Sequence, residues 1–466
     1  MKQKEKTHVF APTVIVIFGV TGDLASTRLI PALVDLYRRD LLPERFGVVG
    51  FARRPFSRED FRDHMATILK NKKKAITKKI EKFFDRVTYV SGDFHGDDSY
   101  QRVSQTLSSI DEKFGMCSNK LFYLAVPPGM YEGIFKRLAS SGLTIPCGGD
   151  EGWTRVLVEK PFGRDIKTAA HLDKMLGELF KEEQIFRIDH YLAKETMQNI
   201  LAFRFSNALF EPIWNKDYIE RVEIRFLETR GIEKRGELFD SVGNLRDVGQ
   251  NHVLQMLAVV AMERPHKEGI SSIRTERAKA LEELAPLSAS EIQKKVIRAQ
   301  YVGFTEEKNI SPNSQTETYF KVEARIENER WRGVPFLLEA GKGMGQTVHE
   351  IVITFRAPHS PAHRNILTFR IQPDEGISIL FWAKKPGFDF ELDRKVLSFR
   401  YKDSRDTKKI PDAYERVLVD AIRGDQTLFA STEEVMAAWK FITPILEHWH
   451  SLQLFRYDKG TEGPEI

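Results

Sequence analysis

The sequence predicts two domains of different class: an α/β domain built on a doubly wound parallel sheet, then an α+β domain with a large antiparallel sheet. Strand-like and helix-like segments alternate up to about residue 188, which is the rhythm of a doubly wound sheet. Beyond that residue, extended segments follow one another with few helices between them, which is typical of antiparallel pairing. We therefore expect a Rossmann-type N-terminal domain at residues 1–188 and an α+β C-terminal domain at residues 189–466.

The first domain opens with a continuous β-branched run at residues 14–18, which predicts a buried parallel strand. Apolar residues at helical spacing follow at 29–37, where Pro31 indicates a helix that starts late or is kinked. The same patterns predict a helix near 57–70 and further strands at 46–53, 87–90, 121–126 and 155–158.

The second domain begins with a predicted helix near 192–206, a strand at 219–228 and a helix at 248–262. A long polar stretch with one helix near 274–284 comes next. The remaining pattern predicts strands at 317–327, 349–356, 365–372, 377–383 and 396–401, and final helices at 410–422 and 432–449. We find no sign of parallel crossovers in this half, so a large antiparallel sheet is expected.

Composition excludes several classes of protein. The longest apolar stretches are too short to cross a bilayer, and the N-terminus is hydrophilic and rich in lysine. The chain has two cysteines, Cys117 and Cys147, without metal-type spacing, so a reducing, cytoplasmic setting is expected. His359 and His363 are separated by a proline that breaks a helical zinc-site geometry, and no metal is expected.

A run of seven lysines from Lys70 to Lys82 raises the question of nucleic-acid binding. Apolar residues recur among and after them at helical spacing: Ile76, Ile80, Phe83, Phe84 and Val87. This pattern predicts one amphipathic helix whose lysines form the solvated face. The net charge of only +5 is also mild for a protein of this size, so nucleic acid is not an expected partner.

Gly19 and Gly22 lie between the first strand and the first helix. Glycines at this position let the backbone approach a pyrophosphate beside a helix N-terminus, although a plain strand–helix turn is the alternative. The second strand ends in Arg53 and Arg54 instead of an acidic residue. An arginine there pairs with a 2′-phosphate, which favours NADP over NAD; a solvated arginine pair is the alternative.

Three segments contain more polar and ionisable residues than packing requires: residues 159–163, 187–195 and 247–252. The first closes a strand at the carboxyl edge of the sheet, where open α/β sheets bind ligands. In the second, His190 and Lys194 are four residues apart and suited to gripping one phosphate. A core role for the third segment's histidine and a helix-capping role for Asp189 are the alternatives. Convergence of all three on one cleft favours a ligand site.

These residues resemble a known family. The motifs Gly-Val-Thr-Gly-Asp-Leu-Ala at 19–25, Glu-Lys-Pro-Phe-Gly at 159–163, Arg-Ile-Asp-His-Tyr-Leu-Ala-Lys-Glu at 187–195 and Arg-Asp-Val-Gly-Gln-Asn-His at 246–252 are similar to those of glucose-6-phosphate dehydrogenases. So are Arg-Trp-Arg-Gly-Val-Pro-Phe at 330–336, Ala-Gly-Lys at 340–342 and Pro-Asp-Ala-Tyr-Glu-Arg at 411–416. The likeness keeps its order over nearly the whole chain.

The resemblance implies NADP-dependent oxidation of D-glucose 6-phosphate at C1 to 6-phospho-D-glucono-1,5-lactone, the first step of the oxidative pentose phosphate pathway. It implies that His252 is the general base and Asp189 its carboxylate partner. The implied substrate contacts are Lys160, His190, Tyr191, Lys194, Glu228, Asp247, Lys342 and Gln372. The implied cofactor contacts are Gly19, Gly22, Asp23, Leu24, Arg28, Arg53, Tyr131 and Lys160. A homodimer or homotetramer is expected.

The sequence also departs from the family pattern. Arg28 stands in the cofactor loop where members generally have a lysine. Thr347 stands shortly after the Ala-Gly-Lys motif, where many members have a basic residue. Glu339, Val348 and Val352 stand where animal relatives place basic groups for a second, structural NADP, so one NADP per subunit is expected. Two other functions compete with the leading one: an NADP-linked dehydrogenase for another sugar, and a non-catalytic NADPH-sensing regulator.

Overall fold

The structure is a computed structural model of the chain, and it describes residues 12–146, 152–265, 270–357, 360–403 and 410–465. Cys147 and His359 therefore lie outside the described residues. The chain divides into two compact units. The first comprises residues 1–163, 170–190 and 411–432, and the second comprises residues 164–169, 191–410 and 433–466.

The first unit is built on a seven-stranded sheet in the order β15-β6-β5-β4-β1-β2-β3. Strands β1 to β6 are all parallel, which confirms the doubly wound α/β class. Their bounds are β1 Thr13–Phe18, β2 Phe46–Ala52, β3 Val87–Ser91, β4 Asn119–Leu124, β5 Thr154–Val158 and β6 Ile185–Ile188. The two-residue β15 (Phe429–Ala430), which we did not predict, adds an antiparallel edge on β6.

Strand β1 lies at the centre of this sheet and pairs with both β2 and β4. All six of its residues are buried, because a parallel strand covered by helices on both faces contacts apolar groups on both sides. The chain therefore reverses its strand order at β1, and the carboxyl end of β1 is the switch point at which open sheets bind nucleotides.

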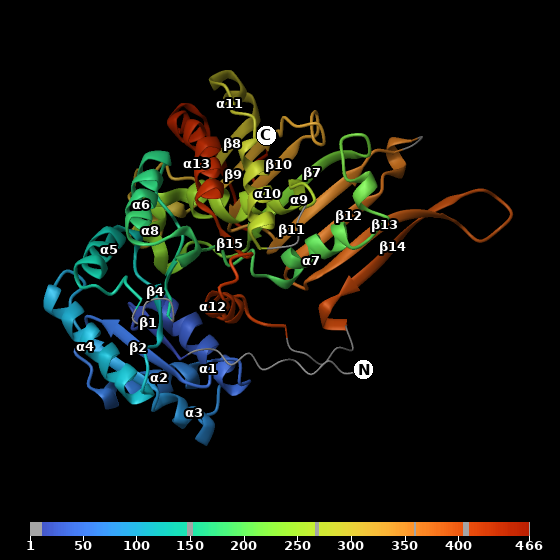
Figure 1. Cartoon of the computed structure of the whole chain (residues 1–466). Helices are drawn as coiled ribbons and strands as arrows, with labels where there is room; N and C mark the ends of the chain where they lie inside the picture. Colours follow the sequence, from blue (N-terminus) through green and yellow to red (C-terminus); the bar gives the residue numbers. More distant parts are fainter. Residues whose placement is uncertain (1–11, 147–151, 266–269, 358–359, 404–409, 466) are drawn as a thin grey trace, which may run out of the picture. The chain divides into compact units, whose positions relative to one another are not determined.

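The helices of the first unit lie around this sheet in Figure 1. They are α1 Ile30–Arg38, α2 Arg58–Asn71, α3 Lys78–Phe84, α4 Asp97–Phe114, α5 Tyr131–Ser140, the greater part of α6 Ile166–Leu179, and α12 Ala413–Arg423. Pro31 occupies the first turn of α1, where a proline costs no hydrogen bond. A π-helical turn, Ala25–Leu29, runs into α1 without a break, so the helix does not start late; the change from π- to α-helix lies next to Pro31.

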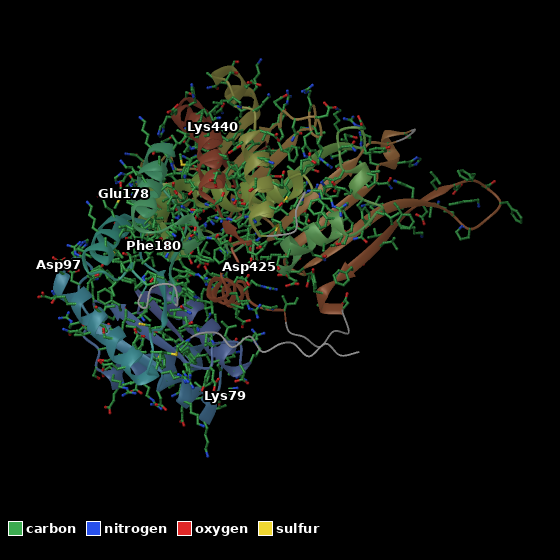
Figure 2. All side chains as sticks on the ribbon, in the orientation of Figure 1. Lys79, Asp97, Glu178, Phe180, Asp425 and Lys440 are labelled. Atoms are coloured by element: carbon green, nitrogen blue, oxygen red, sulfur yellow. The ribbon has the colours of Figure 1, made fainter. Side chains whose placement is uncertain are left out.

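The single lysine-rich helix expected at residues 70–82 is wrong. Helix α2 ends at Asn71, Lys73 adopts a left-handed φ of 56°, and Thr77 then caps α3 by accepting a hydrogen bond from the Ile80 amide. Some of the lysines pair with acidic neighbours: the Lys79 ammonium, at the end of the side chain labelled in Figure 2, lies 2.7 Å from the Asp40 carboxylate. The apolar side of α3 is buried as predicted.

The second unit is built on a nine-stranded sheet in the order β14-β13-β12-β11-β7-β10-β9-β8-β16. The bounds are β7 Ile219–Glu228, β8 Val296–Tyr301, β9 Tyr319–Ala324, β10 Phe336–Lys342, β11 Val348–Phe355, β12 Ile366–Gln372, β13 Gly376–Lys384, β14 Leu392–Arg400 and β16 Leu454–Tyr457. The large antiparallel sheet is confirmed, with two pairs of strands that are parallel instead. β10 pairs parallel with β7, and β16 pairs parallel with β8.

Helices of the second unit are α7 Glu195–Phe205, α8 Gly236–Asn244, α9 Leu254–Ala261, α10 Ile270–Glu282, α11 Ala289–Lys295 and most of α13 Thr432–Glu447. The helix predicted at 248–262 is in fact two kinds of helix. A π-helical segment, Leu245–Val253, leads directly into α9. The Glu317 carboxylate holds its start, because it accepts hydrogen bonds from the Leu245 amide and, at 2.9 Å, from the Trp449 indole.

Candidate active site

Polar residues of the first unit gather at the carboxyl edge of its sheet. Gly19 directly follows β1, Arg53 follows β2 and Asp189 follows β6, and Lys160 is the second residue after β5. Because β1, β2, β5 and β6 run parallel, these residues share one edge. The structure therefore places the predicted cofactor residues where a nucleotide binds in such sheets.

The loop after β1 has the geometry of an anion cradle. Gly19 has a φ of +78°, and a Cβ added there would lie 2.4 Å from the Ala125 carbonyl oxygen, so only glycine fits. The Gly22 amide donates to the Gly19 carbonyl at 2.8 Å, which tightens the turn. No side chain caps the helix that starts just after Asp23 and Leu24, so its N-terminus lies directly at the glycine turn, the position at which such helices bind an anion.

Two arginines lie close to this cradle in the chain. Arg28 is exposed on the π-helical turn, and Arg53 is exposed just beyond β2. Among the described residues neither makes an ion pair, so both charges are available to phosphate groups. The glycine turn, the uncapped helix and the two guanidinium groups fit a dinucleotide that carries an extra phosphate.

A buried carboxyl lies beside Lys160. The Tyr123 hydroxyl donates to the Glu159 carboxylate at 2.5 Å, and burial raises the pKa of Glu159 to about 7. Tyr131, a predicted cofactor contact, is fully buried at the start of α5, and its hydroxyl donates to the Glu159 carbonyl at 3.0 Å. Tyr131 thus anchors the loop that bears Lys160.

His190, a predicted phosphate contact, also lies in the first unit. Its ring stacks on Tyr414 with centroids 5.8 Å apart.

The second unit brings four rings together: Tyr191, Phe226, His252 and His349. The Tyr191 ring lies 4.4 Å from His252 and 4.9 Å from Phe226, centroid to centroid. Phe226, on β7, stacks on His349 at 4.0 Å with an interplanar angle of 12°. His252, on the π-helical segment, is only 1 % exposed. Packing by these rings fixes the direction of the His252 imidazole.

Charged residues lie beside this ring cluster. Glu228 and Lys342 end the parallel strands β7 and β10 opposite each other, and the Lys342 Nζ lies 2.6 Å from the Glu228 carboxylate. Burial by itself would raise the pKa of Glu228, but the Lys342 ammonium outweighs burial and lowers it. Asp247 pairs with Arg235 at 3.4 Å. The site therefore offers carboxylate oxygens that can accept hydrogen bonds from sugar hydroxyls and an ammonium group that can donate to them.

His349 is the point at which the predicted residues of the second unit meet. Its Nδ1 lies 2.7 Å from the Tyr191 hydroxyl. Burial lowers the pKa of His349 to about 4; Glu228 and Gln372 act in the opposite direction, and His252 and Lys194 add to the lowering. Lys194 itself makes no ion pair with any described residue, so an anion can bind it.

Two matches with family models cover nearly the whole chain. The model described as "Glucose-6-phosphate dehydrogenase, NAD binding domain" matches residues 16–199, and that described as "Glucose-6-phosphate dehydrogenase, C-terminal domain" matches residues 201–466. The chain belongs to the glucose-6-phosphate dehydrogenase family.

Members of the glucose-6-phosphate dehydrogenase family in distant bacteria are similar along their full length. The chain is 43 % identical to glucose-6-phosphate 1-dehydrogenase of Aggregatibacter actinomycetemcomitans, over 97 % of this chain and 94 % of that protein. It is 37 % identical to the Bacillus subtilis enzyme, over 99 % of this chain and 96 % of that protein.

Solved structures of glucose-6-phosphate dehydrogenases have the same fold. One, solved in complex with its substrate glucose 6-phosphate, superposes with a TM-score of 0.90 at 34 % identity, covering 98 % of this chain and 96 % of that chain. The enzyme from Mycobacterium avium superposes with a TM-score of 0.85 at 30 % identity and the same coverage. Both the fold and the family predicted from the sequence are thus confirmed.

The sequence alone did not single out two buried polar residues of the candidate site, His349 and Glu159. His349 was named only as part of a strand, and Glu159 only as part of a motif. A signal for His349 was present: it follows the Ala-Gly-Lys motif on a strand, in register with Phe226 and Gln372. What the sequence could not show is that Tyr191, distant in the chain, supplies its hydrogen-bond partner.

One departure from the glucose-6-phosphate dehydrogenase pattern, Thr347, makes a structural contact. The Thr347 hydroxyl accepts a hydrogen bond from the Thr229 amide at 3.0 Å and ties the start of β11 to the end of β7.

Within the described ranges, no three histidine, cysteine, aspartate or glutamate side chains are grouped as a metal site requires. In the same part of the chain, no helix combines the length and the apolar character needed to span a bilayer.

Proposed function

We infer that the protein oxidises C1 of D-glucose 6-phosphate to 6-phospho-D-glucono-1,5-lactone with NADP, the first step of the oxidative pentose phosphate pathway. The observation that supports this most directly is the site of the second unit. His252 is buried there against the Tyr191 and Phe226 rings, and the Glu228–Lys342 pair of the same unit offers acidic and ammonium groups suited to a sugar. The family and the nucleotide cradle agree with it.

His252 is proposed as the general base. Its imidazole accepts the proton of the C1 hydroxyl as the hydride leaves C1, so that the C1–O bond becomes a carbonyl. Bound NADP supplies the hydride acceptor. We propose Asp189 as the carboxylate partner that stabilises the protonated imidazole, as in other His–Asp pairs. Packing against Tyr191 and Phe226 supports a fixed ring direction.

Substrate binding is proposed to separate into a phosphate part and a sugar part. His190, Tyr191 and Lys194 bind the phosphate, and Lys194 supplies the permanent positive charge. Glu228, Asp247, Lys342, Gln372 and Lys160 bind the sugar hydroxyls and orient C1. The Glu228–Lys342 pair supports this, because it offers an acceptor and a donor at one place.

The direct test is to mix the purified protein with glucose 6-phosphate and NADP and to follow reduced nicotinamide. We expect rapid reduction that falls sharply when glucose or another hexose phosphate replaces the substrate. A preference for a different hexose phosphate would favour the competing sugar-dehydrogenase function. No turnover with any sugar, combined with tight NADPH binding, would favour the regulator.

Arg53 is expected to carry much of the NADP preference. A charge-assisted pair contributes roughly 1.5–3 kcal/mol, and screening at this exposed position favours the lower end. Arg53→Ala should therefore raise KM for NADP about tenfold and leave KM for NAD nearly unchanged. Steady-state kinetics with both cofactors, compared with the neighbouring variant Arg54→Ala, measure this. An equal loss with NADP and NAD would assign Arg53 a structural role.

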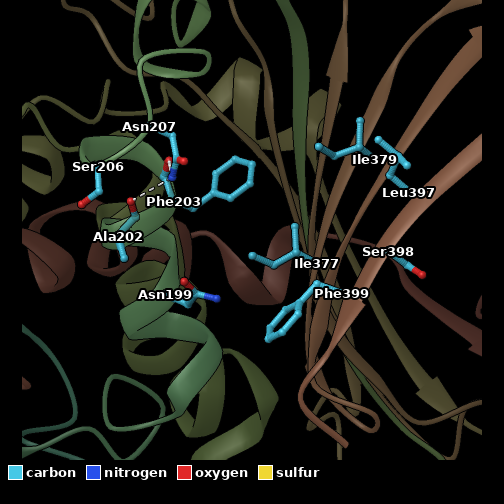
Figure 3. A pocket seen from close by; sticks show the side chains of 10 residues that line it. All are labelled: Asn199, Ala202, Phe203, Ser206, Asn207, Ile377, Ile379, Leu397, Ser398 and Phe399. Carbon is cyan, nitrogen blue, oxygen red and sulfur yellow. Dashed lines mark hydrogen bonds between the residues drawn. The ribbon is translucent and has the colours of Figure 1, made fainter. Parts of the chain in front are cut away.

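The edge of the large sheet supports a proposal about assembly. Strand β14 is the last strand of the sheet, and with the β13–β14 connection it exposes five large apolar side chains, Phe388, Phe390, Val396, Leu397 and Phe399. Between β14, β13 and α7 lies a groove of about 530 Å³ lined by Phe203, Ile377 and Phe399 (Figure 3), and none of the predicted site residues lines it. We propose that a second copy covers this edge in an isologous homodimer.

Sedimentation equilibrium at micromolar concentration is expected to show twice, or for paired dimers four times, the chain mass of 53.7 kDa. Leu397→Asp should shift the mass towards the monomer, because it places a charge on the apolar edge. Val302→Asp, at another exposed apolar residue of the second unit, is the matched control and should leave the mass unchanged. A wild-type monomer would contradict the proposal.

We also propose that each subunit binds one NADP and that the protein is located in the cytoplasm.

A further inference from the structure

His349 makes a contact that the proposed chemistry does not yet use. It lies on β11, is only 4 % exposed, and stacks on Phe226 at 4.0 Å. Its Nδ1 lies 2.7 Å from the hydroxyl of Tyr191, a residue proposed to bind the phosphate. Ring stacking on one face and β-pairing on both sides leave the imidazole little freedom to turn.

The hydrogen bond between these two side chains can run in either direction. A neutral imidazole carries one ring proton, and the low pKa of His349, about 4, keeps the ring neutral near pH 7. If the proton is on Nδ1, His349 donates to Tyr191, and the phenol hydrogen is free to donate elsewhere. If it is on Nε2, Tyr191 donates to His349 and has no hydrogen left for another acceptor.

A phosphate dianion accepts hydrogen bonds and donates none. Tyr191 can therefore bind it as a donor only when His349 donates from Nδ1. In that state the His349 Nε2 is an acceptor, and it is buried without a hydrogen-bond partner among the described residues. The two hydrogen bonds would then run in one direction, from His349 through Tyr191 to the ligand, and each polarises the other.

We propose that His349 is a positioning residue for the substrate phosphate, which it serves by donating its Nδ1 hydrogen to Tyr191 and directing the phenol hydrogen to the phosphate. This rests on the proposed function, in which Tyr191 contacts the phosphate. His349 itself does not touch the substrate in this arrangement. It sets the donor direction of a residue that does.

The test compares His349→Phe, Tyr191→Phe and the double variant in the full-length protein. His349→Phe keeps the ring and its stacking on Phe226 but removes both nitrogens. We expect it to raise KM for glucose 6-phosphate about tenfold, the effect of losing one hydrogen bond to a charged group, with kcat within about twofold. Tyr191→Phe should do the same, and the double variant should be no worse than Tyr191→Phe.

Three controls separate positioning from damage to the fold. Oxidation of unphosphorylated glucose should not change in His349→Phe. His448→Phe removes another histidine of the second unit, whose Nδ1 lies 2.9 Å from the Pro444 carbonyl oxygen, and should leave KM unchanged. His349→Asn, which places an amide donor near the Nδ1 position, should restore most of the lost affinity, whereas His349→Gln should not. These last two variants decide the matter even if His349→Phe fails to fold.

Additive losses in the double variant, or equal losses with glucose and glucose 6-phosphate, would overturn the positioning role. An unchanged KM in His349→Phe together with a raised KM in Tyr191→Phe would overturn it while leaving the proposed function intact. If Tyr191→Phe also has no effect, the phosphate site of the proposed function is wrong, and the role of His349 is wrong with it.

Discussion

Replacing His252 with asparagine is expected to lower kcat by about 10²–10⁴, the usual loss when a general base is removed. Asparagine keeps the size and some hydrogen bonding of the imidazole but accepts no proton near neutral pH. The site offers no ready substitute, because the nearby His349 has a pKa of about 4 and its Nδ1 is bonded to Tyr191. Steady-state kinetics with glucose 6-phosphate and NADP measure the loss.

Substrate affinity should change far less than turnover in this variant. Calorimetric titration of His252→Asn with glucose 6-phosphate is expected to give a dissociation constant within a few fold of the wild type. His448→Asn is a suitable control, because it makes the same replacement at a half-buried histidine of the same unit. Near-native turnover in His252→Asn would show that another group removes the C1 proton.

Lys194→Ala is expected to lower kcat/KM for glucose 6-phosphate by about 10²–10³. Lys194 makes no ion pair with any described residue, so its charge is available to the substrate phosphate. Leaving a sheltered phosphate without its counter-ion costs roughly 2–5 kcal/mol. Activity on free glucose, poor in the wild type, should hardly change, because glucose has no phosphate to bind.

Kinetics with both substrates on both proteins provide the comparison, and Lys194→Arg provides a variant that keeps the charge. Lys194→Arg should retain more activity on glucose 6-phosphate than Lys194→Ala, although its different geometry makes full activity unexpected. A parallel fall of both substrates in Lys194→Ala would mean that the lysine supports the fold instead of the phosphate. The same conclusion would follow if wild-type activity on glucose already matched that on glucose 6-phosphate.

The parallel sheet could be predicted because its strands are apolar on both faces. Strand β1 is buried at every position, and such runs stand out from the sequence around them. Strand β10 shows the opposite case. Its buried and half-buried residues alternate, it ends in a glycine and a lysine, and its parallel partner β7 lies more than a hundred residues earlier in the chain. Short-range patterns carry no information about such a pairing.

The candidate site shows the same division between local and distant information. Gly19, Arg53 and His252 could be found because each lies in a local motif at the end or start of an element. The hydrogen bond between Tyr191 and His349 could not, since it joins residues 158 apart in the chain. The lysine segment failed for a different reason: the left-handed backbone at Lys73 interrupts a helix that side-chain spacing alone would continue.

The π-helical segment at Leu245–Val253 has a consequence for how this part of the protein can change in evolution. Asp247 and His252 are five residues apart, which is the spacing of the i to i+5 hydrogen bonds that join adjacent turns of a π-helix. In an α-helix each residue adds about 100° of rotation, so the same spacing would turn the two side chains well away from each other. Loss of a single residue between them would therefore rotate one side chain against the other in one step. The number of residues between Asp247 and His252 is therefore constrained as strictly as the identity of these two residues.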